Sequence, residues 1–430
     1  MKKARQVVSR LGLGLLAAGI GVHAQPASER SLMSLPNNRI TVHEVRRPRK
    51  AVTGVDSIDW SAATNSLLVG KLSMTRFYNV YTMTPEGINP RSRVLAMPGS
   101  ARVHSGAPSW HPDGKSFVFS CQKQHNADHA HAVPLIGWHT DMWLADSEGT
   151  SFTQLTNESS SRRAPKGVTN PKFSPDGTKL VWSGNNGKTN RSPWQQKAMF
   201  MADFGQEDGK PKLSNIREFQ PGENRDFYES YGFSPDGTTI LFAANMIRGN
   251  PWHDTDICVS RSGQDPANLT GSRGVWDRFA TYSPNGKKII WTSSRGIRIR
   301  YLGTRGEKWQ RYLQSELWIM DADGKHQKQL TFFNQAGHAH FEGRRVFLGD
   351  SAFSPDGESV AVVMYKEKQN FVPESEIVIL KLGNGPPPRA QDREPGNGGK
   401  PPANKTGKPA PKPPKPKQDE DKGDPGTITW

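Results

Sequence analysis

The chain of 430 residues is poor in cysteine, and its apolar stretch at residues 11–22 is too short to cross a membrane. Its two cysteines, Cys121 and Cys258, cannot build a disulfide framework. They fall in segments that we expect to be strands of separate, non-adjacent repeat units, where disulfide geometry is hard to reach. The sequence therefore predicts two buried free thiols.

Short motifs of common enzyme classes are also missing. The chain contains no nucleophile elbow of a Ser-His-Asp triad, no phosphate-binding loop and no His-Glu-x-x-His string. These absences argue against the hydrolase and nucleotide-enzyme classes that depend on those motifs. A recognisable nucleic-acid-binding motif is absent as well, so we do not expect nucleic acid as a partner.

Both ends of the chain lack the composition of a folded domain. Residues 1–24 combine basic residues, an apolar stretch and a small-residue cleavage site, which is typical of a signal peptide. The signal predicts a periplasmic or secreted protein without a membrane span. We expect residues 25–38 to form a linker between this segment and the folded domain. Residues 385–430 are dominated by Pro, Lys and Gly, which predicts a disordered tail. Its expected role is that of a spacer, with binding to an anionic wall or membrane polymer as the alternative.

The formal net charge of the chain is +16. The signal segment carries +4 and the tail +3, which leaves about +9 on residues 25–384. A basic domain in an envelope compartment suits anionic polysaccharides or acidic protein surfaces. Diffuse charge that only keeps the protein in solution explains the same number equally well.

The chain does contain a repeated turn motif. An aromatic residue is followed by Ser-Pro-Asp-Gly, or a close variant, and then by a short apolar run. Proline presets φ and glycine accepts a positive φ, so each copy predicts a β-hairpin. Five copies are clear and a sixth is degenerate: residues 110–114, 173–177, 233–237, 282–286 and 353–357, and residues 60–69.

A second motif follows the hairpin in most units. Residues 141–146 lead to Gln-Leu-Thr at 154–156, and residues 316–324 lead to the same tripeptide at 329–331. Each unit therefore predicts four strands, named a to d in chain order. The turn prolines are 49 to 71 residues apart, which is typical of propeller blades with insertions of variable length.

These motifs resemble the TolB-type propeller repeat, most clearly at residues 320–331 and in the Phe-Ser-Pro-Asp-Gly turns. The resemblance covers roughly residues 40–382. It implies an all-β fold, a six-bladed β-propeller of four-stranded antiparallel blades at residues 39–384. It implies little about function, because the repeat occurs in transport, protease-associated and lyase proteins. The last unit lacks a fourth strand, so we expect residues 40–45 to close the ring as its outer strand.

The a–b and c–d turns are short, so the long insertions lie in the b–c and d–a connections on the other face of the disc. Long loops on a rigid scaffold are where binding residues concentrate. Arg298, Arg300 and Arg311 belong to one basic insertion, and guanidinium groups hold carboxylates well. Trp194 and Trp252 each follow a proline, and their rings suit stacking on sugars or fastening a loop to the propeller.

Gln335, His338 and His340 form the sharpest short string. It resembles the Gln-x-x-His-x-His string with which oligogalacturonate lyases bind a divalent metal, and this implies one divalent ion here, with Mn, Ca and Zn not distinguished. Residues 341–350 separate the string from the next turn, unlike in the lyases. Packing of the two histidines within their loop is the alternative. The positions equivalent to the family's additional histidine hold other residues: Ala107, Asn170, Ser230 and Phe279.

Two functions of different classes stay open. The first is a binding module, expected to be monomeric, that docks an envelope protein or an anionic polysaccharide through the loop-rich face. The second is a metal-dependent lyase that cleaves uronate-containing oligosaccharides by β-elimination. Its base would be one of His104, Tyr228, Arg278 or Tyr301. We rank binding first, because it needs no active site.

Overall fold

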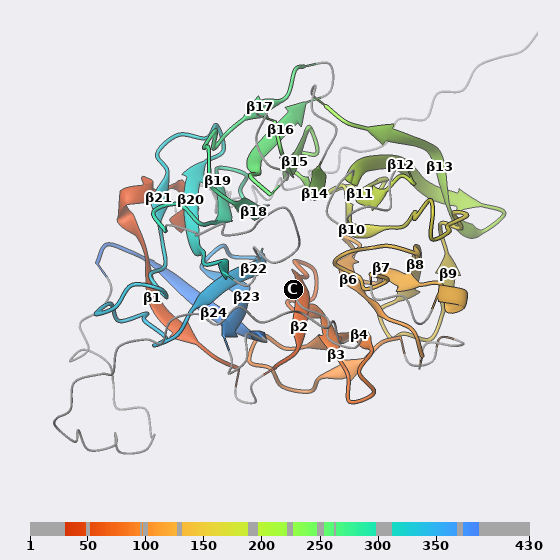
Figure 1. The fold of residues 1–430 in the computed structure, drawn as a ribbon, viewed down its shortest axis with the longest axis horizontal. Coiled ribbons are helices and arrows are strands. Elements are labelled where there is room, and N and C mark those ends of the chain that lie inside the picture. The colour runs from red at the N-terminus through yellow and green to blue at the C-terminus, as the bar shows by residue number, and fades with distance from the viewer. Residues whose placement is uncertain are drawn as a thin grey trace, which may run out of the picture.

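The computed structural model describes residues 31–48, 52–94, 97, 102–126, 131–187, 197–221, 227–246, 253–261, 264–297, 312–367 and 373–386. Their strands form six separate antiparallel sheets of four strands, arranged around a central axis (Figure 1). The prediction of an all-β, six-bladed propeller of four-stranded antiparallel blades is confirmed. The segment expected to be a signal peptide and almost all of the expected tail lie outside the described residues.

The blades follow one another in chain order. The first contains β2 (Val55–Trp60), β3 (Leu67–Leu72), β4 (Tyr78–Met83) and β5 (Arg91–Ser92). The second contains β6 (Ser105–Trp110), β7 (Ser116–Gln122), β8 (Thr140–Asp146) and β9 (Phe152–Gln154). The third contains β10 (Thr169–Phe173), β11 (Lys179–Asn185), β12 (Lys197–Glu207) and β13 (Lys210–Phe219).

The remaining three blades have the same order of strands. The fourth contains β14 (Tyr228–Phe233), β15 (Thr239–Ala244), β16 (Asp256–Arg261) and β17 (Ala267–Asn268). The fifth contains β18 (Asp277–Tyr282), β19 (Lys288–Ser293), β20 (Glu316–Asp321) and β21 (Lys328–Gln329). The sixth contains β22 (Val346–Phe353), β23 (Ser359–Glu367), β24 (Pro373–Asn384) and β1 (Ile40–Arg46).

The repeated turn motif closes each a–b hairpin through local hydrogen bonds. In the third blade, the Ser174 hydroxyl accepts from the backbone N–H of Lys179 at 2.9 Å and donates to the Asp176 carboxylate. The same carboxylate accepts from the N–H of Thr178 at 3.0 Å. Gly177 has φ of 72°, which only glycine adopts freely. These bonds lower the pKa of Asp176 to about 2. Serine, aspartate and glycine therefore each contribute to the geometry of this turn.

The second motif ties strand c to the end of strand d. An acidic residue lies at or next to the start of strand c, and its carboxylate accepts a hydrogen bond from the threonine hydroxyl of the Leu-Thr pair. The same hydroxyl accepts a hydrogen bond from the backbone N–H of the residue after the acid. Each buried carboxylate thus receives a partner. The acid and threonine pairs are Asp141 and Thr156, Asp256 and Thr270, and Glu316 and Thr331.

The ring is closed by the chain's first described strand. β1 pairs with β24 in antiparallel register, with Ile40 opposite Asn384 and Val42 opposite Leu382. Met33, which precedes this strand, is fully buried in the hydrophobic cluster between the fifth and sixth blades. The predicted closure is confirmed, and the described strand is one residue longer than expected.

The hydrophobic cores lie between neighbouring blades. One cluster joins Val118 of the second blade to Phe173 and Trp182 of the third. Another joins Leu317 of the fifth blade to Val360 of the sixth. Each sheet is packed against both neighbours, so the innermost strands β2, β6, β10, β14, β18 and β22 are held around the axis (Figure 1). The two cysteines are buried and free, as predicted.

Candidate functional site in the axial pocket

A pocket of about 290 Å³ lies on the axis, where the innermost strands end and the a–b turns begin. All six blades line it. Every innermost strand carries a β-bulge shortly before its end. A bulge changes the direction of the side chains that follow it. The last two residues of each innermost strand both line the pocket, and they form two rings around the axis.

The outer ring consists of the aromatic residues that precede the turns. Turn prolines at positions 235, 284 and 355 extend this apolar rim. Three of the six aromatic rings are half-buried, so part of their surface is open to the pocket. The six aromatic residues are Trp60, Trp110, Phe173, Phe233, Tyr282 and Phe353.

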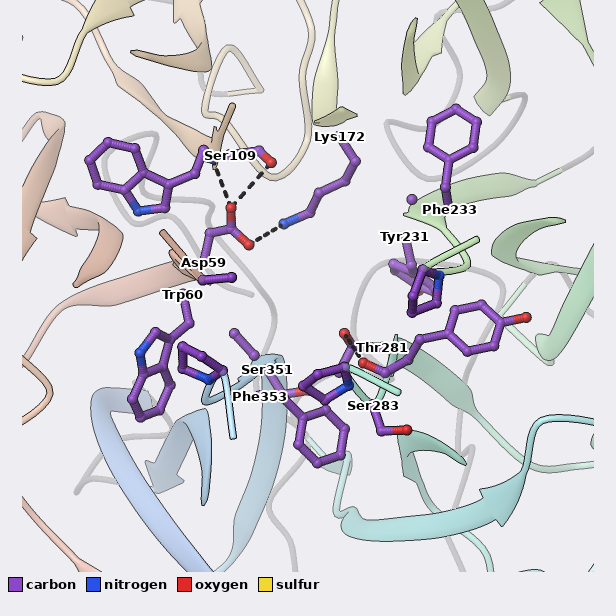
Figure 2. Close-up of a pocket in the computed structure, with 18 of the residues that line it drawn as sticks. Asp59, Trp60, Ser109, Lys172, Tyr231, Phe233, Thr281, Ser283, Ser351 and Phe353 are labelled. Carbon is purple, nitrogen blue, oxygen red and sulfur yellow. Dashed lines mark hydrogen bonds and ion pairs between the residues drawn. The ribbon is translucent and has the colours of Figure 1, made fainter. Parts of the chain in front are cut away.

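The inner ring supplies the polar floor. Asp59 and Lys172, from the first and third blades, form an ion pair across the pocket with 3.2 Å between Oδ1 and Nζ (Figure 2). The second Asp59 oxygen accepts from the Ser109 hydroxyl at 3.2 Å and from the backbone N–H of Trp110 at 2.8 Å. Asp350, in the bulge of β22, accepts at 3.0 Å from the N–H groups of Ile58 and Ser351.

The floor has an excess of negative charge, because two carboxylates face one ammonium group among the lining residues. Burial alone would lower the pKa of Lys172, but Asp59 and Asp350 raise it above its ordinary value. Lys172 is therefore charged at neutral pH. Burial raises the pKa of Asp350 to about 6, although the Lys172 ammonium opposes this shift. Asp350 is consequently ionised for the most part at pH 7.

Deeper in the channel lies a third carboxylate, that of Asp56. It is almost fully buried and accepts from the Ser57 hydroxyl at 2.7 Å. Burial raises the pKa of Asp56 to about 7; the Ser57 hydroxyl lowers it and the nearby Asp350 carboxylate raises it. Three carboxylates thus lie on β2 and β22, the innermost strands of two neighbouring blades, and of these only Asp59 is in an ion pair with Lys172.

A second buried group of charges adjoins the pocket through Tyr231, whose hydroxyl donates to Glu229 at 2.8 Å. Glu229 also accepts from both Nε and Nη2 of Arg278. Lys197 lies 3.7 Å from the same carboxylate and donates to the Leu135 carbonyl at 3.1 Å. Burial would raise the pKa of Glu229, but Arg278 and Lys197 lower it. Burial lowers the pKa of Lys197 to about 8.

Three of the four residues predicted as candidate bases are described, and none of them lines the axial pocket. His104 is buried; its Nδ1 accepts from the N–H of Tyr78 at 3.0 Å, and burial lowers its pKa to about 4. Tyr228 is fully buried and donates to the Pro221 carbonyl at 3.1 Å. Arg278 holds Glu229, as described above. A catalytic role for these residues stays a prediction.

The string predicted to bind a metal lies in the connection between the fifth and sixth blades. His338 Nδ1 accepts from the N–H of His340 at 3.0 Å, and its ring centroid is 4.4 Å from that of Phe332. The two histidine rings are 4.5 Å apart, and Gln335 is exposed. No group of three or more His, Cys, Asp or Glu suited to a metal occurs among the described residues. These contacts fit loop packing, and the metal site stays a prediction.

The other predicted site residues lie outside the described parts of the chain: Trp194, Trp252, Arg298, Arg300, Tyr301 and Arg311. Asp59, Lys172 and Asp350 were not predicted. The repeat itself was the signal for Asp59 and Lys172, because the residue before each strand-end aromatic forms the inner ring, and only these two of the six positions are charged. Asp350 lies three residues before its aromatic and has no such signal. Within the described ranges, no helix has the length and hydrophobicity of a membrane span.

Comparisons with known proteins found distantly similar solved structures. No family model and no curated protein matches the chain. A putative TolB from Agrobacterium tumefaciens is 17% identical over 81% of this chain and 99% of its own length, with a TM-score of 0.47. TolB from Acinetobacter baumannii is 16% identical over 77% of this chain and 66% of its own length, with a TM-score of 0.43.

An oligogalacturonate lyase in complex with manganese is 10% identical over 80% of this chain and 96% of its own length, with a TM-score of 0.44. At such identities the likeness concerns the fold alone. The assignment as a propeller rests on the six four-stranded sheets of this chain.

Proposed function

We propose that the protein is a binding module whose axial pocket receives a segment of a protein partner that carries a basic side chain. The observation behind this proposal is the ring of six aromatic residues around a floor with two carboxylates and one ammonium group. Aromatic faces attract cations through their quadrupole, and an unneutralised carboxylate adds a direct ion pair. Both features favour a Lys or Arg side chain.

The size of the pocket supports a side chain or a short segment as the ligand. Its volume of about 290 Å³ is at the lower end of the roughly 300–1,000 Å³ range of small-molecule sites. A uronate polymer would bring further negative charge toward Asp59 and Asp350. An envelope protein is therefore a better ligand for this pocket than an anionic polysaccharide. Docking of an anionic partner on the loop-rich face stays a separate prediction, because its arginines lie outside the described residues.

The test uses the chain that ends at residue 386, which retains all six blades and the closing strand. The probe is the capped peptide Gly-Pro-Lys-Pro-Gly, with Glu and norleucine versions as matched peptides. Titration is followed by tryptophan fluorescence, because Trp60 and Trp110 line the pocket. We expect the Lys peptide to bind and the Glu peptide not to bind. Equal binding of all three peptides, or of none, would refute the proposal.

Two pairs of variants locate the binding. Asp350→Asn removes a carboxylate from the floor, and we expect about five-fold weaker binding, equivalent to about 1 kcal/mol. The control Asp323→Asn removes an exposed carboxylate from a c–d turn of the same face and should leave binding unchanged. Phe233→Ala removes part of the rim, whereas its control Phe341→Ala changes an exposed aromatic residue in a d–a connection.

A pH series tests the charge of the floor. As pH falls below about 6, Asp350 becomes protonated and the excess negative charge is lost, so Lys-peptide binding should weaken. Asp350 faces Asp56 and Asp59 of β2, Lys172 of β10 and Tyr365 of β23. The Asp350→Asn variant should show a smaller change over the same range. An equal change in both proteins would assign the effect to another group.

A further inference from the structure

We propose that residues 408–417 of the same chain occupy the axial pocket, so that the propeller is blocked until a partner displaces them. The proposal rests on the proposed function, because it assumes that the pocket accepts basic segments. Residues 387–430 lie outside the described residues, and the inference uses their sequence together with the place where the described chain ends.

The described chain ends on the face where the pocket opens. Strand β24 runs toward the a–b turns, with Lys381 opposite Ser359 in β23. The N–H of Leu382 donates at 2.8 Å to the carbonyl of Glu358, the residue that follows the Ser-Pro-Asp-Gly turn of the sixth blade. Pro355 of that turn lines the pocket. Gly385 then pairs with the outer edge of the sixth blade, where its N–H donates to the Arg39 carbonyl. The segment after residue 386 therefore starts at the outer edge of this blade, on the face where the pocket opens and not on the loop-rich face.

The charge of the segment complements the floor. Residues 408–417 contain four lysines and no acidic residue. The floor contains Asp59 and Asp350 against Lys172 alone, so one carboxylate lacks a basic partner within the pocket lining. A lysine of the segment would provide it. The three acidic residues at 419–421 come after Gln418 and lie outside this stretch.

The aromatic rim of the pocket suits the prolines of the segment. Five of the ten residues at 408–417 are prolines. Such a sequence favours the polyproline II conformation, which aromatic-lined grooves recognise because little conformational entropy is lost on binding. The rim contains the six strand-end aromatic residues and three turn prolines. Prolines would pack on these rings while lysines reach the floor.

The connecting chain is long enough. Residues 387–407 separate the described end from the segment, and a flexible chain of that length has a root-mean-square extent of about 25 Å. A compact domain of the propeller's size has a radius of gyration of about 20 Å. The pocket is therefore within ordinary reach, and short tethers of this kind give effective concentrations of about 1 mM.

The experiment compares the full mature chain with the chain that ends at residue 386. The probe is a fluorescein-labelled peptide of residues 406–418, measured by anisotropy. We expect the peptide to bind the shorter chain and to bind the full chain at least about ten-fold more weakly, because the tethered copy competes. Asp350→Asn in the shorter chain should weaken peptide binding, and Asp323→Asn should not.

Charge variants of the full chain avoid truncation. Changing Lys408, Lys412, Lys415 and Lys417 to Glu should restore peptide binding to the level of the shorter chain. The matched control changes Lys400, Lys405 and Lys422 to Glu and should stay blocked. Equal binding of the peptide to the full and the shorter chain would overturn the inference.

The remaining outcomes separate this inference from the proposed function. If the Lys pentapeptide binds the shorter chain but the 406–418 peptide does not, the intramolecular occupant is refuted and the binding function stands. If neither peptide binds the shorter chain, both are refuted. If Asp350→Asn leaves binding of the 406–418 peptide unchanged, the peptide binds elsewhere and the occupant is refuted.

Discussion

Deleting residues 31–46 should destabilise the whole propeller, because these residues supply the outer strand of the sixth blade. Met33 and Ile40 are fully buried and Val42 is 3% exposed. Burial of such side chains contributes about 1.5–3 kcal/mol each, so the three together contribute about 5–9 kcal/mol. Domains are stable by only about 5–15 kcal/mol, so the deletion removes much of the total. It also exposes the edge of β24 to aggregation.

A single substitution separates closure from the general effect of a deletion. Ile40→Ala should lower the free energy of unfolding by about 2–5 kcal/mol. Its control is Glu44→Ala, because Glu44 lies in the same strand and is exposed; such surface changes stay within about 0.5 kcal/mol. Urea unfolding followed by tryptophan fluorescence measures both. An unchanged midpoint for the deletion, or equal effects of the two substitutions, would refute the closure by β1.

Three further predictions concern buried polar groups and the histidine string. The pKa of Asp56 is raised to about 7, so the unfolded chain loses its proton at lower pH than the folded protein. As pH rises from about 4 to 7, this group should therefore lower the free energy of unfolding by up to about 4 kcal/mol. Asp56→Asn should reduce this dependence on pH, measured by urea unfolding at each pH. Thr331→Val leaves buried Glu316 without one donor and should lower the free energy of unfolding by about 1–3 kcal/mol, measured in the same way. If His338 and His340 bind a metal, chelator should lower the melting temperature of wild type but not of the double Ala variant; an equal response would leave loop packing as their role.

The fold could be predicted because its signals are local. Ser174, Asp176 and Gly177 make their hydrogen bonds within a stretch of six residues, so one copy of the motif already defines one hairpin. The number of copies then gave the number of blades. The closing strand was predictable for a different reason. The last unit lacked a fourth strand, and residues 40–45 formed a strand pattern that belonged to no other unit.

The axial pocket could not be predicted in the same way. Asp59 and Lys172 are 113 residues apart, on the first and third blades, and meet only when these blades pack around the axis. The long insertions also predicted a binding site on the opposite face, where the b–c and d–a connections lie. The available signal was the alignment of six copies, in which Asp59 and Lys172 occupy the same position before the aromatic residue.

The net charge of the domain and the charge of its pocket point to different partners, and the range of electrostatic interactions explains why. About +9 on residues 25–384 influences approach over long distances, and salt screens such effects beyond about 8–10 Å. The group that enters the pocket is instead chosen by charges within a few ångströms, which are Asp59, Lys172 and Asp350. Binding of a basic side chain at the floor should therefore persist at high salt, whereas binding of an anionic polymer to the outer surface should not. A basic propeller is on this ground compatible with the proposed binding of a basic side chain in its pocket.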